Sequence, residues 1–192
     1  MHRLVSGFAL LLSLTLLPGT PANAAPDVAP AVERTGGLAV RHLAWGPLRV
    51  GMTAQQSWDT GMVSRERKAC AEGYQMTEQF ADRGSVWWRE VDGKQRVSLI
   101  LIRSEIDRTP KGFGVGTTLG ELRQAFPKLT KVTSNAKLDG QRPSGKRDYW
   151  VASVRKRGSH INFQFPYGRK PTSGTKVEMV VLSRKQTIFP GC

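Results

Sequence analysis

The sequence contains few of the residues on which enzymes and metalloproteins most often depend. Its 192 residues include three histidines, at positions 2, 42 and 160, and two cysteines. Two dispersed imidazoles beyond the first residues, without a carboxylate at ligand spacing, do not make a metal site. The glycines of KGFGVGTTLGE (111–121) are not followed by the Lys-Ser/Thr pair of a nucleotide-binding loop. The sequence therefore predicts neither a metal nor a cofactor.

Pairs of residues that could perform catalysis are also scarce. Ser159 precedes His160, but neighbours on a strand face opposite sides of a sheet and cannot act as nucleophile and base. Glu105 and Asp107 could face the same way, yet they precede Thr109 and Pro110 in an expected turn, where charged residues are common. We therefore predict a non-enzymatic protein, and a hydrolase of unrecognised type is the alternative.

Long apolar runs are missing except near the start. LVSGFALLLSLTLL (4–17) follows a short basic segment and is too short for a comfortable membrane span. Ala22-Asn23-Ala24 then has the small-x-small pattern of a cleavage site. We expect a signal peptide over residues 1–24, no membrane span, and a secreted protein that works outside the cell or in the cell-envelope space. An uncleaved anchor is the alternative.

The two cysteines, Cys70 and Cys192, follow this segment. Export would place both in an oxidising space, where only one intramolecular pairing is open to them. We predict a Cys70–Cys192 disulfide. It would close a loop of more than a hundred residues, which the chain-entropy model values at roughly 4 to 5 kcal/mol. Two unpaired thiols are the alternative.

The rest of the chain predicts one domain with two similar halves. Residues 25–37, rich in Ala and Pro, are expected to form a flexible arm before a domain at 38–192. VGMTAQQ (50–56) and VGTTLGE (115–121) each contain a capping box, in which Thr53 pairs with Gln56 and Thr118 with Glu121. Strand patterns follow each expected helix. We expect an α+β fold of two tandem helix-plus-antiparallel-sheet repeats, at about 48–108 and 113–192; a chance resemblance of the two stretches is the alternative.

Strand signals are strongest in four places. Residues 85–102 predict a hairpin that turns at Asp92-Gly93, and residues 148–155, 159–167 and 176–183 predict three more strands, with a turn at Arg157-Gly158. Alternation around Ile161 and Phe163 predicts one buried and one solvated face. Of the adjacent pair Trp87 and Trp88, one should lie in the core and the other on the opposite face.

The Gly-Met-Thr turn that opens a capped helix, together with its second occurrence, resembles the β-lactamase inhibitory protein of soil actinobacteria. Single copies resemble the small lipoprotein of the outer-membrane barrel-assembly machine. GPLRVGMT, TPKGFGVG and the terminal GC resemble a group of actinobacterial secreted proteins over nearly the whole mature chain. These resemblances imply an α+β protein whose sheet docks a partner without chemistry of its own. The inhibitor has a disulfide within each repeat and this chain does not, so no inhibitory residues are carried over.

Acidic residues are scarce in the second half of the chain. Residues 103–192 hold eighteen basic and six acidic side chains, whereas residues 25–102 hold ten and nine. Most of the basic groups fall at expected turns, and turns at one end of a sheet meet in space. The candidate binding residues are Lys146, Arg147, Tyr149, Trp150, Arg155, Lys156, Arg157, His160, Arg169 and Lys170.

Such a basic surface favours an anionic partner, because it raises the local concentration of polyanions. For an exported protein we expect an anionic cell-envelope polymer or an acidic protein surface, the latter as the target of an inhibitor. No nucleic-acid-binding motif is present, so nucleic acid is not the expected partner. A generic solvated surface is the alternative interpretation of the charge.

Overall fold

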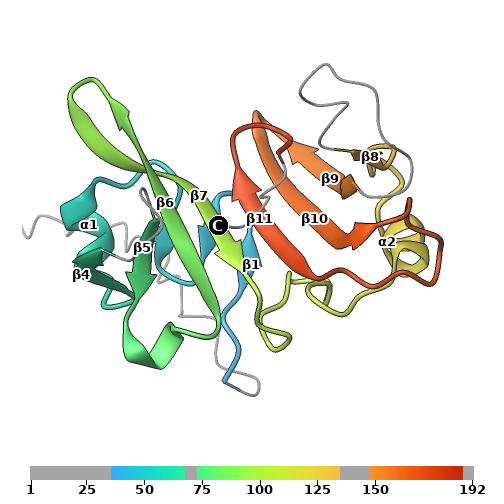
Figure 1. Cartoon of the computed structure of the whole chain (residues 1–192), viewed down its shortest axis with the longest axis horizontal. Coiled ribbons are helices and arrows are strands. Elements are labelled where there is room, and N and C mark those ends of the chain that lie inside the picture. The colour runs from blue at the N-terminus through green and yellow to red at the C-terminus, as the bar shows by residue number, and fades with distance from the viewer. Residues whose placement is uncertain (1–35, 68–72, 135–147, 188–192) are drawn as a thin grey trace, which may run out of the picture. The chain divides into compact units, whose positions relative to one another are not determined.

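The computed structural model describes residues 36–67, 73–134 and 148–187 (Figure 1). The described residues form eleven strands, two α-helices and one short 3₁₀ helix: β1 (Val40–Arg41), β2 (Ala44–Trp45), β3 (Leu48–Arg49), α1 (Ala54–Trp58), β4 (Val63–Arg67), β5 (Gly73–Met76), η1 (Glu78–Phe80), β6 (Gly84–Val91), β7 (Lys94–Ile102), α2 (Leu119–Ala125), β8 (Thr133–Ser134), β9 (Asp148–Lys156), β10 (Ser159–Gly168) and β11 (Met179–Ser183). The expected signal peptide, the Cys70–Cys192 disulfide, Lys146 and Arg147 lie outside the described residues.

Eight of these strands form one sheet in the order β4-β5-β6-β7-β11-β10-β9-β8. Every pair of neighbours is antiparallel. The pairing of β7 with β11, in which Leu101 lies opposite Val181, joins segments from the two halves of the chain at the middle of the sheet (Figure 1). β1, β2 and β3 form a separate sheet of two-residue strands that the sequence did not predict.

The expectation of an α+β fold built from two tandem helix-plus-sheet repeats is wrong. The described chain is mostly β-sheet, with α-helices of only five and seven residues. Both capping boxes are present as predicted, but a cap fixes where a helix begins and not how far it runs. α1 ends at Trp58, and Gly61 then takes a φ of 70° just before β4. The two halves share one sheet, which the pairing of β7 with β11 makes continuous.

The two tight turns predicted from sequence are confirmed. Asp92 and Gly93 have φ angles of 50° and 67°, and Arg157 and Gly158 have 47° and 72°. Two successive positive φ angles are typical of a type I′ turn, whose twist matches that of the flanking strands. The β6–β7 and β9–β10 hairpins therefore end where the sequence places them. Arg157 adopts this left-handed conformation without the freedom of glycine.

The main core lies on one face of the large sheet. Its largest fully buried side chains include Trp45, Phe163 and Phe165, and both helices contribute to it. A smaller apolar cluster, formed by Leu101, Met179 and Val181, lies apart from it, with Trp87 and Leu99 packed against it. Trp88 is 5% exposed and belongs to the main core, so the two tryptophans pack in different clusters.

The second face of β10 is not solvated, contrary to the prediction. Asn162 is fully buried there and donates from Nδ2 to Val181 O at 2.9 Å and to Ser183 Oγ at 2.8 Å. Its Oδ1 accepts from Ser153 Oγ at 2.6 Å and from the backbone N–H of Thr187 at 3.4 Å. Polar side chains can be buried when their hydrogen bonds are met in this way. Asn162 thereby ties the segment after β11 to β10.

Candidate functional site

Basic side chains gather at one end of the large sheet. The β6–β7 turn, the β9–β10 turn and the end of β11 all lie there, because these strands are antiparallel, with Ile100 in β7 opposite Leu182 in β11 and His160 in β10 opposite Ser183 in β11. We call this surface the basic end. Its basic residues are Arg89, Lys94, Arg96, Arg155, Lys156, Arg157, Arg184 and Lys185, against the acidic Glu90 and Asp92. All except the partly buried Arg96 are exposed.

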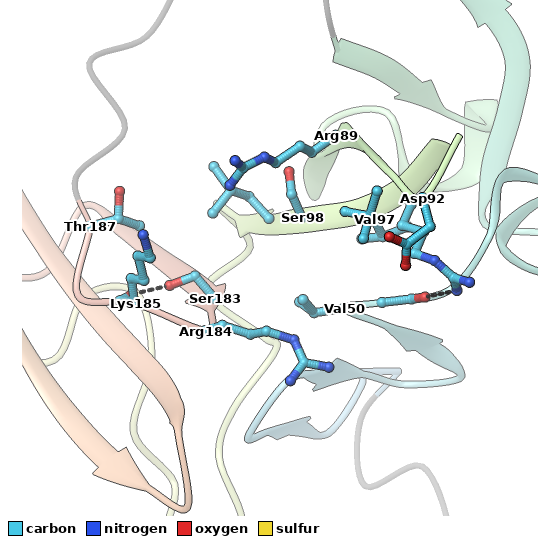
Figure 2. Close-up of a pocket in the computed structure, with 13 residues that line it drawn as sticks. Val50, Arg89, Asp92, Val97, Ser98, Ser183, Arg184, Lys185 and Thr187 are labelled. Atoms are coloured by element: carbon cyan, nitrogen blue, oxygen red, sulfur yellow. Dashed lines mark hydrogen bonds between the residues drawn. The ribbon is translucent and has the colours of Figure 1, made fainter. Parts of the chain in front are cut away.

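A cleft with a volume of about 660 Å³ opens at the basic end, where the β6–β7 hairpin and the segment after β11 diverge (Figure 2). It has four basic lining residues and one acidic one, namely Arg89, Arg96, Arg184, Lys185 and Asp92. Apolar side chains also line it, including Val50 before α1 and Val97 and Leu99 in β7. A site of this volume falls within the range of small-ligand pockets, about 300 to 1,000 Å³.

The turn that precedes α1 lies beside two of the cleft arginines. Gly51 donates its N–H to Val97 O at 2.7 Å, and Val97 donates to Met52 O at 2.8 Å, so the turn is attached to β7. Arg96 donates from Nη1 to Gly51 O at 3.1 Å. A Cβ on Gly51 would lie 3.5 Å from Nη2 of Arg184, so both guanidinium groups lie beside this glycine. Gly51 has a φ of 98°, which favours glycine.

The structure brings together only part of the predicted binding set. Arg155 lies directly opposite His160, and both lie at the basic end with Lys156 and Arg157. Arg169 and Lys170 follow β10 at its far end, about 30 Å away along a ten-residue strand at the usual rise per residue. The structure therefore does not bring that pair together with the basic end.

The two predicted aromatic binding residues lie at the far end as well. Trp150 is 6% exposed, packs in the main core and donates from Nε1 to Gly168 O at 2.9 Å. It is thus a core residue and not a docking side chain. Tyr149 is half-buried and packs against Tyr167, with ring centroids 4.7 Å apart and ring planes tilted by 47°. Tyr167 is 54% exposed, so it presents the larger aromatic surface at this end.

Sequence reasoning did not assign a binding role to the basic residues of the β6–β7 hairpin, Arg89, Lys94 and Arg96. Nothing in the local pattern distinguishes them from ordinary solvated strand residues. Their position beside Arg184 depends on the pairing of β7 with β11, which is a long-range contact.

Ser159 contacts a different histidine from its sequence neighbour. Its Oγ lies 3.1 Å from Nδ1 of His42, which is distant in sequence, and it also donates to the backbone carbonyl of Lys156. Since a carbonyl oxygen only accepts, this bond uses the single hydroxyl hydrogen, and Oγ is then an acceptor for the His42 tautomer that carries a proton on Nδ1. A histidine that donates to the hydroxyl cannot remove its proton, so this pair does not have the geometry of nucleophile and base.

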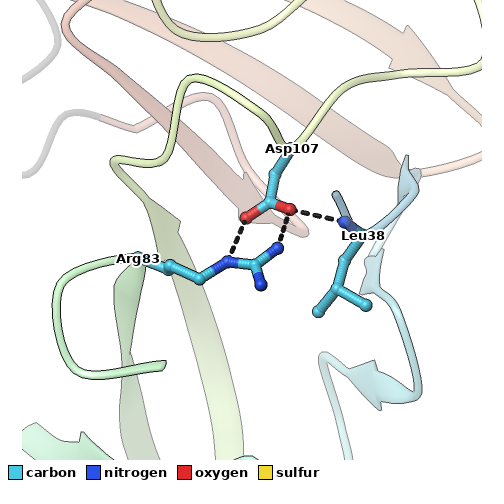
Figure 3. A network of polar contacts seen from close by, with 3 residues as sticks. All are labelled: Leu38, Arg83 and Asp107. Carbon is cyan, nitrogen blue, oxygen red and sulfur yellow. Dashed lines mark hydrogen bonds and ion pairs between the residues drawn. The ribbon is translucent and has the colours of Figure 1, made fainter. Parts of the chain in front are cut away.

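The second pair weighed for catalysis is also separated by the fold. Glu105 is exposed, whereas Asp107 is fully buried and forms an ion pair with Arg83 (Figure 3). Arg83 donates from Nε to Oδ2 of Asp107 at 3.2 Å, and the backbone N–H of Leu38 donates to Oδ1 at 2.5 Å. The prediction that Asp107 lies in an ordinary charged turn is therefore wrong, because its carboxylate holds three segments together.

Burial and neighbouring positive charge affect both described histidines. The pKa of His42 is lowered from 6.5 by burial, by Lys156 and by His160. The pKa of His160 is lowered from the same value by burial and by Arg155. Both effects disfavour the charged imidazolium in the folded state. The unfolded chain therefore takes up protons at higher pH than the folded one.

We expect acid to destabilise the protein through these two residues. The stability contributed by the two neutral imidazoles is fully present above pH 6.5. It is lost as the pH falls from 6.5 through the lowered pKa values of the folded state. Urea denaturation between pH 7 and about pH 5 should show a decline that is smaller in the double variant His42→Asn, His160→Gln. Parallel profiles for the two proteins would contradict the assignment. The pKa of Glu121 is lowered from 4.5, chiefly by hydrogen bonds from Thr118. Protonation of this carboxylate therefore affects stability only below pH 4.5, outside the range of this experiment.

Within the three described ranges, no group of three or more His, Cys, Asp or Glu side chains could hold a metal ion. No helix in the described part of the chain is long and apolar enough to cross a membrane. Comparison with known proteins found no matching family model, no matching curated protein and no matching solved structure. A proposal for the function therefore rests on the geometry of the basic end.

Proposed function

We propose that this protein is a secreted, non-enzymatic binding protein that recognises an anionic polymer of the cell envelope through the basic end of its large sheet. One observation carries the proposal. Three separate chain segments place eight basic and two acidic side chains at the same end of the sheet. A concentration of one sign of charge attracts polyanions and speeds their encounter.

The distribution of this charge favours an extended ligand. The basic groups are spread over two hairpin turns and the end of β11, so a chain of repeating phosphates can contact several of them in succession. The cleft between β7 and the segment after β11 offers Arg89, Arg184 and Lys185 to one part of such a chain. Arginine suits this role because its planar guanidinium can donate two hydrogen bonds to one phosphate.

The conformation of Arg157 is consistent with a role for its charge. This residue has a φ of 47°, where asparagine or glycine would be less strained. This conformation costs of order 1 kcal/mol or more. The turn keeps an arginine although asparagine or glycine would cost less. Replacement by asparagine therefore removes the charge without weakening the turn.

An acidic protein surface is the second candidate partner, and it would make the protein an inhibitor or an adaptor. Val91 favours it, since this side chain lies next to the β6–β7 turn and is 41% exposed beside the basic residues. An exposed apolar side chain among charges is common in protein interfaces and serves no purpose toward a polyphosphate chain.

Binding of purified poly(glycerol phosphate) teichoic acid tests the proposal. The triple variant Arg155→Gln, Lys156→Gln, Arg157→Asn should lower the slope of log affinity against log salt concentration by about two, by analogy with flexible single-stranded polyanions. Its affinity at 50 mM salt should fall by roughly an order of magnitude or more. Isothermal titration calorimetry at 50, 100 and 200 mM salt measures both quantities.

A matched variant controls for net charge. Arg123→Gln, Lys128→Gln, Lys131→Gln removes the same three charges from exposed positions on and after α2. It should keep most of the affinity and of the salt slope. If the two triple variants lose affinity equally, the binding reflects total charge and the proposed surface is wrong. Binding of an acidic protein but not of teichoic acid would favour the second candidate.

A further inference from the structure

A second pocket lies away from the cleft, on the core side of the sheet. It has a volume of about 450 Å³ and is formed by β1, the 109–111 segment, the end of α2, β9 and β10. Five apolar residues line it, namely Val40, Pro110, Phe126, Val154 and Ile161. None of its residues is shared with the 660 Å³ cleft.

The charged residues of this pocket all have one sign. Arg41, Lys111 and Lys156 line it together with His42, and no acidic residue does. Lys111 is held over the apolar part, since its Nζ lies 5.2 Å from the ring centroid of Phe126 and donates to Ala125 O at 3.4 Å. All three cations are exposed, so they surround an apolar interior with positive charge.

His42 is held in one orientation at this pocket. Its Nδ1 is engaged by Ser159 Oγ, which leaves Nε2 as the remaining ring nitrogen. Lys156 and His160 are the charged or titratable groups that act on this imidazole, and the pocket adds Arg41 and Lys111. Positive charge from three separate segments, those of Arg41, Lys111 and Lys156, thus surrounds a pocket that no carboxylate of the described residues lines.

From this combination we infer that the pocket is a binding site for a small amphiphilic anion: one molecule that carries an apolar group and a single anionic head. The apolar group would lie against Phe126, Val154 and Ile161. The head would be bound by Lys111, Arg41 and Lys156, which supply charge-assisted hydrogen bonds to an anion. The volume suits one small ligand and excludes a polymer from the interior.

Binding of an amphiphile in this pocket should depend on the length of its alkyl chain, which binding at the polymer site should not. Burying each methylene stabilises by about 0.8 kcal/mol, so affinity should rise roughly threefold to fourfold per methylene as the alkyl chain lengthens, until the pocket is full. Binding at an exposed basic surface depends on the head alone. The dependence on chain length therefore separates the two sites.

Calorimetric titration of the purified protein with butyl, hexyl and octyl sulfate, all below their micelle concentrations, provides the test. We expect saturable binding of one octyl sulfate per chain, weaker binding of the shorter sulfates and none of octyltrimethylammonium. The double variant Arg41→Gln, Lys111→Gln should bind octyl sulfate roughly tenfold more weakly. Val154→Thr, which places a hydroxyl in the apolar interior, should reduce the gain per methylene.

The control variant is Arg123→Gln, Lys128→Gln, which changes two exposed charges outside the pocket and should bind octyl sulfate as the unaltered protein does. As an independent readout, the imidazole resonances of His42 in NMR spectra should titrate at higher pH when octyl sulfate is bound, because the anion favours the imidazolium. Equal affinity for all three sulfates, equal loss in both double variants, or binding only above the micelle concentration would overturn the inference.

Discussion

Replacing Asp107 by alanine is expected to lower the free energy of unfolding by about 3 to 5 kcal/mol, the usual cost of breaking a buried ion pair from one side. Asp107 is fully buried, whereas the side chain of its partner Arg83 is 19% exposed. Removing the carboxylate leaves the guanidinium with its hydrogen bonds unmade. It also leaves the backbone N–H of Leu38 without the acceptor that fixes the start of the described chain (Figure 3).

The comparison of variants identifies the cause of this effect. Asp107→Asn keeps an acceptor for Leu38 and should be destabilised less than Asp107→Ala. The double variant Arg83→Leu, Asp107→Leu should lose less stability than the sum of the two single replacements, since it leaves no unpaired charge. Urea denaturation followed by tryptophan fluorescence gives these values. A loss below about 1 kcal/mol for Asp107→Ala is what a surface ion pair contributes, and it would contradict the role of Asp107 as a buried partner of Arg83.

The second large effect is expected at Trp45. This side chain is fully buried in β2, with the ring of Phe80 packed edge-on against it at 6.3 Å. A Cβ on Gly84 in β6 would lie 3.0 Å from the indole, so the ring covers this glycine of the large sheet. Trp45 therefore attaches the small sheet to the large one. Trp45→Ala should lower the free energy of unfolding by about 3 to 5 kcal/mol through the cavity that it creates.

Two further variants test whether packing alone explains the role of Trp45. Its Nε1 has no hydrogen-bond partner within the described residues, so Trp45→Phe loses contact area but no hydrogen bond and should cost clearly less than Trp45→Ala. Gly84→Ala should also destabilise, because the added Cβ would meet Leu101 O at 2.1 Å as well as the indole. Thermal unfolding monitors all three. Equal costs for Trp45→Phe and Trp45→Ala would point to a lost polar contact instead.

The local part of the fold could be predicted from the sequence. Thr53 and Thr118 cap their helices through hydrogen bonds to residues three positions away, and Asp92-Gly93 and Arg157-Gly158 form their turns. These features depend on contacts within a few residues, so the residue types that make them are adjacent in the sequence. The strands at 85–102, 148–155 and 159–167 could be predicted because their β-branched and aromatic residues and the turn residues that bound them are also local signals.

The candidate site was only half predictable. The basic residues around Arg157 stand together in the sequence and lie together in the structure. Arg89 and Arg96 join Arg184 because β7 pairs with β11, and Arg169 is separated from them because β10 is long. A cluster of charges in the sequence indicates which residues share a turn, but not which turns share an end of a sheet.

The sequence by itself determined the helix starts, the turn positions, the location of the longer strands and the excess of positive charge. Tertiary structure alone decided that the strands form one eight-stranded sheet, that Asn162 and Asp107 are buried with their partners, and that a cleft opens beside Gly51. The physical reason is that backbone N–H and C=O groups are chemically the same at every residue. Which strands they join depends on how the whole chain buries its apolar side chains.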